Sequence, residues 1–305
     1  MIKKVFIGLL LLGVILLVGV FLLTYPPRNF ILKTPEVLGS RVASNEWQPK
    51  DILGSQQAPK ITAHAAYFVD IDSGEVLYKK NEKIRAPVAS LVKVMTAIVT
   101  LENRDWADKV EVSSFAASQE PDHMILQQGE VLTVEELLYG VFLISGNDAA
   151  EALAESITGD RIDFIKFMNT KASLLGMRDT LFINPSGLQE DTQTQYSTAY
   201  DVALMSRFAI KQFPKLLDIS STPYKYIEET ETHQDYTLYS GINLLTTYPG
   251  VVGFKTGYTP EAGMTLITVA KRDGRIVLGV LLNSESRRDE ARELLDYSFK
   301  KLGID

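Results

Sequence analysis

The chain has 305 residues, a formal net charge of −7 and no cysteine. The lack of cysteine excludes thiol catalysis, disulfide bonds and zinc–thiolate sites, and a mildly acidic chain without a basic stripe does not suit nucleic-acid binding. The length is enough for one large domain or two small ones.

The N-terminus predicts a membrane anchor. Lys3 and Lys4 precede an uninterrupted apolar run over residues 5–23, and about 20 such residues cross a bilayer as a helix. The lysines should stay in the cytoplasm, which places the rest of the chain on the extracytoplasmic side of the cell membrane. A cleaved signal peptide is the alternative, but its apolar region is usually shorter and is followed by an Ala-x-Ala type site, which this sequence lacks.

Three parts follow along the chain. Residues 1–24 are the expected signal-anchor, which crosses the membrane once. Residues 25–60 are rich in Pro, Ser, Asn and Gln without sustained periodicity, as expected of a linker. Residues 61–305 are the expected globular domain.

This domain opens with a strand–turn–strand pattern and a buried helix. Two apolar segments, 67–71 and 75–78, flank the turn sequence Asp-Ser-Gly. Pro87 then favours an extended approach. The segment from Leu91 to Leu101 is apolar on nearly every side, so we expect a helix that is buried.

Ser90 and Lys93 stand in the first turn of that helix, on one face. A serine hydroxyl is inert until a base takes its proton. An ordinary lysine is protonated at pH 7, but burial and a second cation lower its pKa. The pair therefore predicts a nucleophile and its base, with a lysine that snorkels to the surface as the alternative. The same spacing at Ser298-Phe299-Lys300-Lys301 lies in an amphipathic C-terminal helix and predicts no site.

The middle of the chain is predicted to be mainly helical. Ser145-Gly146-Asn147 lies between two of its helices, and a hydroxyl and a carboxamide in such a loop can relay a proton and hold a substrate amide. The alternative is helix capping by Asn147 or Asp148, because Asp148 with Glu151 resembles a capping box. The predicted helices are 134–142, 148–157 and 162–175.

Strands are predicted again near the C-terminus. Asp273-Gly274 is a strong hairpin signal between two of them. Because strands come from both ends of the chain and helices from its middle, we predict an α/β (α+β) fold, an antiparallel sheet flanked by helices. The predicted strands are 251–259, 264–271 and 275–282, and a helix over 288–302 ends the chain.

Lys255-Thr256-Gly257 lies within the first of these strands. A glycine inside a strand usually marks a bulge or a close backbone approach. An edge strand there can add an extended peptide to the sheet, with Lys255 and Thr256 toward the substrate's negative end. Lys255 is also the expected second cation, which leaves one lysine neutral and one charged. The alternative is a plain edge strand with a protective lysine.

The three motifs together resemble those of the penicillin-recognising serine acyltransferases. The chain is most similar to the low-molecular-weight penicillin-binding proteins of the D-alanyl-D-alanine carboxypeptidase family. The resemblance covers roughly residues 63–302. Four stretches carry it: Pro87–Thr96, Ser145–Ala150, Asn184–Leu188 and Gly253–Thr259.

The resemblance implies a β-lactamase/transpeptidase-like fold without metal or organic cofactor, and removal of the terminal D-Ala from peptidoglycan stem peptides. β-Lactams are then covalent inhibitors. Ser90 would form the acyl-enzyme with Lys93 as base, and Ser145 and Asn147 would match the second motif. Lys255, Thr256 and Gly257 would form the substrate-binding strand.

Two further roles are implied by the resemblance. The backbone N–H groups of Ser90 and Tyr258 would match the oxyanion hole, where some relatives carry His instead of Tyr258. An arginine before the last helix binds the substrate carboxylate in relatives, which corresponds to Arg287, with Arg288 as the alternative. Many relatives also have a second β-rich domain and a C-terminal anchor, which this sequence does not show.

Other functions are weighed against this one. A peptidoglycan endopeptidase of the same superfamily uses the same machinery on cross-links. A class A β-lactamase adds a Glu-x-x-Leu-Asn segment that is absent here. A non-catalytic wall-binding or β-lactam-sensing module would not need every motif side chain. A Ser-His-Asp hydrolase is poorly supported, because no G-x-S-x-G sequence exists and the three histidines are scattered: His64, His123 and His233.

Overall fold

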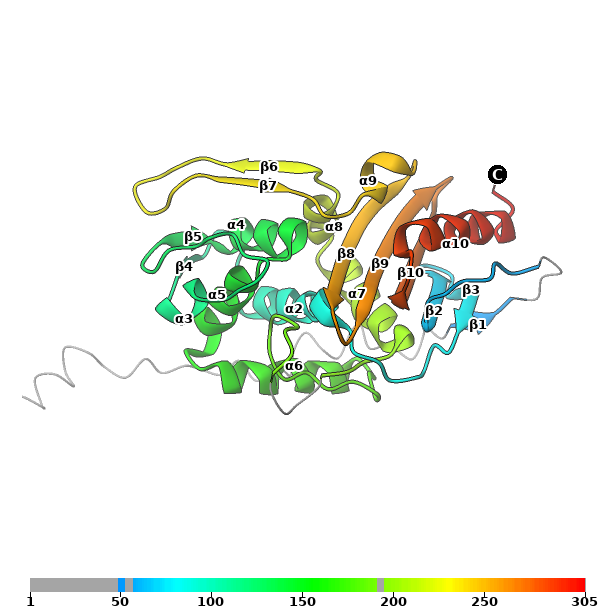
Figure 1. Cartoon of the computed structure of the whole chain (residues 1–305), viewed down its shortest axis with the longest axis horizontal. Coiled ribbons are helices and arrows are strands. Elements are labelled where there is room, and N and C mark those ends of the chain that lie inside the picture. Colours follow the sequence, from blue (N-terminus) through cyan, green and yellow to red (C-terminus); the bar gives the residue numbers. More distant parts are fainter. Residues whose placement is uncertain (1–48, 53–56, 191–194, 305) are drawn as a thin grey trace, which may run out of the picture. The chain divides into compact units, whose positions relative to one another are not determined.

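The structure is a computed structural model, and it describes residues 49–52, 57–190 and 195–304 (Figure 1). The expected anchor and most of the expected linker lie outside the described residues. Within the described ranges, no helix is both long enough and apolar enough to span a bilayer. Strand β1 (Lys50–Asp51) falls inside the expected linker and pairs in parallel with β3 (Glu75–Lys80).

A six-stranded sheet organises the fold, in the order β1-β3-β2-β10-β9-β8. Apart from β1 with β3, neighbouring strands are antiparallel, and strands from both ends of the chain meet at the centre. Among the described residues, β8 pairs with β9 alone and so forms an edge. The predicted antiparallel sheet is therefore confirmed. Its other strands are β2 (Ala65–Asp70), β8 (Val251–Thr259), β9 (Gly263–Arg272) and β10 (Arg275–Ser284).

The sheet is buried on both faces, because alternate side chains of its strands enter two separate cores. On β2, Phe68 packs in the core beneath α10 (Arg287–Lys301), whereas Tyr67 and Val69 pack against the helices from the middle of the chain. Figure 1 shows α10 on one side of the sheet and α7 (Ala199–Gln212) on the other. Full burial of such side chains contributes about 1.5–3 kcal/mol each, which fixes the sheet between two layers.

The middle of the chain is mainly helical, as predicted. The expected helix over 134–142 differs, because its α-helical part ends at Tyr139 and a single π turn, η2 (Gly140–Ile144), continues it. The helices are α2 (Lys93–Asn103), α3 (Ser114–Ala117), α4 (Val134–Tyr139), α5 (Asn147–Thr158), α6 (Arg161–Leu174), α8 (Lys215–Ser220) and α9 (Leu244–Thr247).

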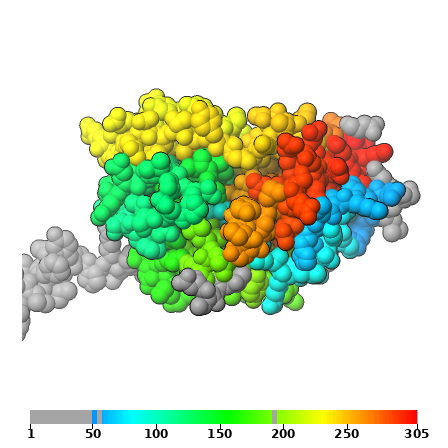
Figure 2. All heavy atoms as spheres, viewed as in Figure 1, coloured from blue at the N-terminus to red at the C-terminus, as the bar shows by residue number. Residues whose placement is uncertain are grey.

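Two short ribbons were not predicted from the sequence. The β6–β7 ribbon lies along the helical part, as Figure 2 shows in yellow above green. After β7, the chain passes through the short helix α9 and enters β8. The ribbons are β4 (Lys109–Glu111) with β5 (Val131–Thr133), and β6 (Tyr224–Ile227) with β7 (Tyr236–Tyr239).

The predicted capping box at the start of α5 is wrong. The N-cap residue is Gly146, which makes no side-chain cap. The Asp148 carboxylate instead accepts the backbone N–H groups of Met124 at 3.0 Å and Leu126 at 3.1 Å. Glu151 is buried one turn further on. Asp148 therefore holds a neighbouring loop against the helix.

Candidate active site

Ser90 lies in a short 3₁₀ turn, η1 (Ala89–Val92), directly before α2. The turn begins with Ala89 at a φ of 49°, a left-handed conformation that redirects the chain after Pro87. Ser90 is half-buried, and Lys93, the first residue of α2, is fully buried. The Ser90 Oγ and Lys93 Nζ atoms are 2.9 Å apart. The predicted neighbours on one helix face thus make a direct hydrogen bond.

Lys93 Nζ has two further partners, Asn147 Oδ1 at 2.7 Å and the Ser186 carbonyl oxygen. Both of these oxygens can only accept. A neutral amine donates its two protons to them and keeps its lone pair for the Ser90 hydroxyl. Burial lowers the pKa of Lys93 to about 7. The geometry and the pKa both suit a base for Ser90 at neutral pH.

Asn147 is oriented by a second contact. Its Nδ2 donates to the Pro121 carbonyl oxygen, so its Oδ1 faces Lys93. The residue is almost fully buried at the N-terminus of α5. The alternative prediction, that Asn147 merely caps this helix, does not apply, because no side-chain cap bond forms there.

Ser145 and Lys255 form the second hydroxyl–amine pair. Ser145 ends the π turn with a φ of 64°, and its Oγ lies 3.0 Å from Lys255 Nζ. Lys255 also donates to the Thr256 carbonyl at 2.8 Å. Burial lowers the pKa of Lys255 well below its ordinary value, and the positive charges of Lys93 and Arg287 lower it further. Lys255 therefore lies within electrostatic reach of Lys93.

The strand β8 lies against Ser90 because Gly257 has no side chain. A Cβ atom at Gly257 would lie 3.0 Å from the Ser90 nitrogen and 2.6 Å from Thr265 Oγ1. The next residue, Tyr258, keeps its side chain in solvent, with 63% of its surface exposed. Only its backbone faces the sheet, opposite Met264. The edge strand, its glycine and the nucleophile are thus adjacent.

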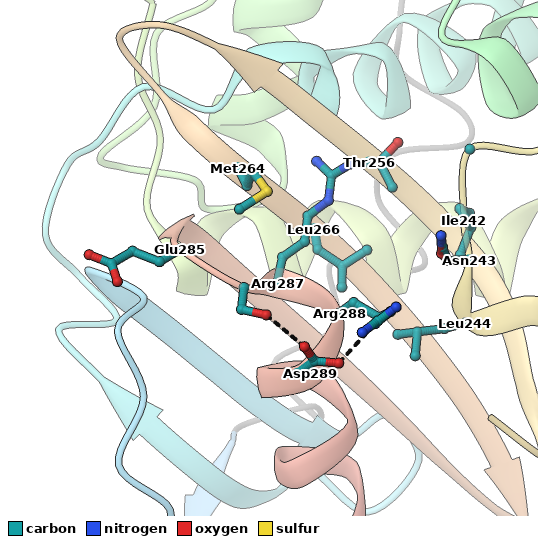
Figure 3. Close-up of a pocket in the computed structure, with 12 residues that line it drawn as sticks. Ile242, Asn243, Leu244, Thr256, Met264, Leu266, Glu285, Arg287, Arg288 and Asp289 are labelled. Carbon is teal, nitrogen blue, oxygen red and sulfur yellow. Dashed lines mark hydrogen bonds and ion pairs between the residues drawn. The ribbon is translucent and has the colours of Figure 1, made fainter. Parts of the chain in front are cut away.

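Arg287 reaches the same strand from the first turn of α10. Its Nη1 donates to the carbonyl oxygens of Gly257 at 2.7 Å and Thr265 at 3.2 Å. It lies with Thr256 on the wall of one pocket (Figure 3). Arg288 instead makes an exposed ion pair with Asp289 at 2.8 Å. Of the two arginines considered from the sequence, Arg287 is the one bonded to the β8 backbone.

The loop 184–188 is a part of the site to which the sequence assigned no role. Its Ser186 carbonyl contacts Lys93, and its Pro185 carbonyl accepts Thr96 Oγ1 at 2.6 Å. A Cβ atom at Gly187 would lie only 2.3 Å from the Ala89 carbonyl oxygen. The sequence feature that could have identified this loop is the Asn184–Leu188 stretch, which is one of the four that carry the family resemblance. It contains no side chain with an evident catalytic use.

A second missed residue is Glu151, on α5 one turn after Asn147. Its side chain is fully buried, with the nearest counter-charge at Arg161 Nε, 3.3 Å away. Within the described residues, neither carboxylate oxygen has a hydrogen-bond partner. Burial raises the pKa of Glu151 to about 7, and its charge raises that of Lys93. A buried acid therefore lies within electrostatic reach of the candidate base.

The second serine–lysine pair takes no part in this site. Ser298 is buried in α10 and donates to the Leu294 carbonyl at 2.5 Å. Lys301 donates to the Leu77 carbonyl at 3.1 Å. The Ser298 contact lies within α10, and the Lys301 contact joins α10 to strand β3, as expected of a structural helix.

Comparison with known proteins agrees with this arrangement. The sequence pattern of the family described as D-alanyl-D-alanine carboxypeptidase matches residues 53–286. D-alanyl-D-alanine carboxypeptidase DacF of Bacillus subtilis is 34% identical over 294 residues, which cover 94% of this chain and 70% of that protein.

Solved structures share the fold. A D-alanyl-D-alanine carboxypeptidase from Mycobacterium tuberculosis superposes with a TM-score of 0.76 at 31% identity, covering 82% of this chain and 96% of that one. Penicillin-binding protein D2 from Listeria monocytogenes, solved in an ampicillin-bound form, has a TM-score of 0.68 at 32% identity, covering 80% of this chain and 100% of that one. The predicted β-lactamase/transpeptidase-like fold is confirmed, and the chain belongs to the D-alanyl-D-alanine carboxypeptidase family.

Proposed function

We propose that this chain is a serine-type D-Ala-D-Ala carboxypeptidase that trims the terminal D-Ala from peptidoglycan stem peptides. The observation that carries the proposal is the 2.9 Å contact between Ser90 Oγ and the buried Lys93 Nζ, whose pKa is lowered to about 7. The edge strand β8 lies beside this pair, and its outer edge, which pairs with no other strand of the described residues, can add an extended peptide to the sheet. Family membership supplies the substrate class.

In the proposed acylation step, the Ser90 oxygen attacks the carbonyl carbon of the penultimate D-Ala while its proton moves to neutral Lys93. The carbonyl oxygen becomes an oxyanion, which we assign to the backbone N–H groups of Ser90 and Tyr258. Loss of one such donor typically costs about 10²–10³ in rate. The C–N bond then breaks. The leaving amine takes the proton back from Lys93, with the Ser145 hydroxyl as the assigned relay.

Deacylation reverses the roles. Water attacks the ester carbon and gives its proton to Lys93, which returns it to the Ser90 oxygen as the ester bond breaks. The products are the shortened peptide and the free enzyme. Asn147 is assigned to the substrate amide, whereas Lys255, Thr256 and Arg287 are assigned to the C-terminal carboxylate, as hydrogen-bond donors and, for the Arg287 guanidinium, as an opposite charge.

β-Lactams are the proposed covalent inhibitors. A relative with the same fold has been solved in an ampicillin-bound form, and a β-lactam presents a strained amide and a carboxylate to the same groups. The acyl-enzyme on Ser90 would persist because the leaving amine stays tethered within the adduct.

The test is mass spectrometry of purified muropeptides after incubation with the full chain. We expect each pentapeptide stem to lose one alanine, and Ser90→Ala to abolish the loss. Conversion of cross-linked dimers to monomers without loss of alanine would replace the proposal with an endopeptidase. If the muropeptides stay unchanged while the chain still binds β-lactams covalently, the proposed carboxypeptidase would be contradicted in favour of a β-lactam sensor.

Membrane attachment through residues 5–23 is also a proposal. It rests on the length of the apolar run and on the lysines before it. The check is the membrane fraction after alkaline extraction, combined with the intact mass of the purified chain. Retention in the membrane with an uncleaved N-terminus is expected, and a chain that begins near residue 25 would overturn the proposal.

A further inference from the structure

A chain of polar side chains runs from α5 to the loop 184–188, and none of the roles assigned above to catalysis or to substrate binding uses it. It begins at Glu151, whose fully buried carboxylate lies 3.3 Å from the Nε atom of Arg161, the first residue of α6. The Nη2 atom of Arg161 donates to the Oε1 atom of Glu190, just after the loop. Arg161 thus joins an acid inside the protein to a second acid nearer its surface.

The guanidinium of Arg161 is held in one orientation. Within the described residues, neither carboxylate oxygen of Glu151 has a hydrogen-bond partner, and a buried carboxylate needs a nearby cation, which only Arg161 supplies at ion-pair distance. The Phe115 ring lies against the same guanidinium, with its centroid 5.7 Å from Cζ. Fixed by these two groups, the guanidinium presents its Nη2 atom to Glu190.

The Glu190 carboxylate orients the side-chain amide of Asn184, which is fully buried at the start of the loop. Its Oε1 atom accepts from Asn184 Nδ2 at 3.1 Å. Because an ionised carboxylate can only accept hydrogen bonds, the Nδ2 side of the amide must face Glu190 and the Oδ1 side must face away. Asn184 Nδ2 also donates to the Leu188 carbonyl at 2.7 Å, which supports the same orientation.

Asn184 in turn orients the peptide unit between Ser186 and Gly187. Its Oδ1 atom accepts the Gly187 backbone N–H at 2.7 Å. This peptide is trans, and the N–H and C=O groups of a planar trans peptide point in opposite directions. With its N–H turned to Asn184, the unit directs the Ser186 carbonyl oxygen at Lys93 Nζ. The chain of contacts that starts at Glu151 therefore ends on the proposed base.

We propose that Arg161 and Glu190 are positioning residues for the proposed base. Acting through Asn184, they keep the Ser186 carbonyl on Lys93, which leaves the lone pair of the neutral amine for the nucleophile. The proposal rests on the serine acyl-transfer function argued above. A misplacement of about 1 Å can cost about 100-fold in rate, so loosening this peptide unit should slow acylation.

The test replaces Glu190 by Met in the full chain. The Glu190 side chain is 42% exposed, so its replacement should leave the chain folded. We expect the rate constant for acylation by a labelled penicillin to fall by about tenfold or more, while the dissociation constant of the non-covalent complex and the final labelled fraction stay at their wild-type values. Stopped-flow mixing over a range of penicillin concentrations separates these three quantities. An unchanged rate constant would overturn the proposal, and so would a loss confined to the labelled fraction, which is the sign of unfolded protein.

Two matched variants test the specificity of this effect. In Glu190→Gln, the amide oxygen can still accept from both Arg161 and Asn184, so the acylation rate should return close to the wild-type value. Glu75→Met removes another glutamate that pairs with an arginine, Arg275, in β3 near the opposite edge of the sheet from β8, and it should acylate as the wild type does. A loss in either variant equal to that in Glu190→Met would contradict the proposed contact.

The part played by Arg161 is tested in combination, because Arg161→Met alone would leave Glu151 buried without its counter-charge and destabilise the chain. The double variant Glu151→Gln/Arg161→Met removes both charges. It should slow acylation as Glu190→Met does, and adding Glu190→Met to it should cause little further loss, because residues that act through one network are not additive. A wild-type rate in the double variant, or a full additional loss in the triple variant, would remove Arg161 from the chain of contacts.

The same experiments keep this proposal separate from the proposed carboxypeptidase function. The variants are scored on penicillin acylation, which requires Ser90 and its base but not release of D-alanine. Failure of the wild type to release D-alanine from a pentapeptide stem would contradict the carboxypeptidase function. Wild-type acylation in Glu190→Met would contradict the positioning role alone.

Discussion

At the residue scale, the proposed chemistry depends on two buried amines, and their surroundings distinguish them. Lys93 contacts the Ser90 hydroxyl and two carbonyl-type oxygens, so a neutral Lys93 would donate to those two oxygens and turn its lone pair to Ser90. Lys255 faces Ser145 and its own strand. The sequence analysis predicted one neutral and one charged lysine, and this division stays a prediction for titration to test.

The rate of acylation should depend on pH through the protonation of Lys93. The pKa of Lys93 lies near 7 because burial disfavours its charged form. Below pH 7 it is protonated and cannot take the Ser90 proton, so the rate of β-lactam acylation should fall up to tenfold per pH unit, with an apparent pKa near 7. Stopped-flow acylation from pH 5 to pH 9 measures this. A flat profile would contradict the role of Lys93 as base, and Lys93→Ala should lose about 10²–10⁴-fold.

Glu151 should make stability fall as pH rises. Its pKa rises from an ordinary 4.5 to about 7 on folding because it is buried. The folded state therefore binds more protons between those values, and the free energy of unfolding decreases from pH 4.5 to pH 7 by up to about 3 kcal/mol. Glu151→Gln removes this slope. Urea unfolding of both chains at pH 5 and pH 8 measures it, and an equal pH dependence in the two would contradict the assignment.

The sequence could predict Ser90, Lys93 and the other motif residues because their types and spacing are distinctive. It could not predict Glu151 as part of the site. A glutamate at a helix N-terminus suggests capping, and only the packing of α5 on α2 and α6 reveals that this side chain is buried. The Ser186 contact was equally hidden, because it uses a backbone carbonyl.

At the element scale, three segments hold the nucleophile: the η1 turn, the edge strand β8 and the loop 184–188. Two glycines allow this approach. Gly257 lets β8 lie against the Ser90 nitrogen, and Gly187 lets the loop lie against Ala89. The glycine in the strand was predicted from the sequence to mark a close backbone approach, and the structure confirms it.

Gly187→Ala should damage acylation. A Cβ atom there would lie 2.3 Å from the Ala89 carbonyl oxygen, at a φ of +93°. Gly129→Ala is the matched control, because its φ is +87° and nothing lies within 4 Å of the added atom. Both variants should lose stability by at least about 0.4–1 kcal/mol, but only Gly187→Ala should slow acylation, by tenfold or more. Equal acylation rates in the two variants would show that the loop does not position Ser90.

The elements that sequence reasoning missed are short. The strands of the two ribbons have three or four residues, too few alternating positions to separate a strand from a loop. The π turn at 140–144 continues an apolar helical pattern without a break, so its end could not be seen. Long, strongly patterned elements such as β9, β10 and α10 were predicted to within a few residues.

At the scale of the whole molecule, the site forms where distant parts of the chain meet. Ser90 comes from the first third, Ser145 and Asn147 from the helical middle, and Lys255 and Arg287 from the end. The sheet brings them together because its central strands, β2 and β10, come from opposite ends of the chain. The sequence analysis predicted a sheet with strands from both ends of the chain, which implies that these distant segments come together. The pocket lined by Thr256 and Arg287 depends on side-chain packing, which the sequence alone does not show.

The central claim is that Ser90, activated by Lys93, is the nucleophile. Its most direct test is intact-mass and peptide-map analysis of the full chain after incubation with a labelled penicillin. The account predicts one covalent adduct, located on the peptide that contains Ser90 and absent from Ser90→Ala. A stable adduct on another residue, or an undiminished adduct in Ser90→Ala, would contradict it.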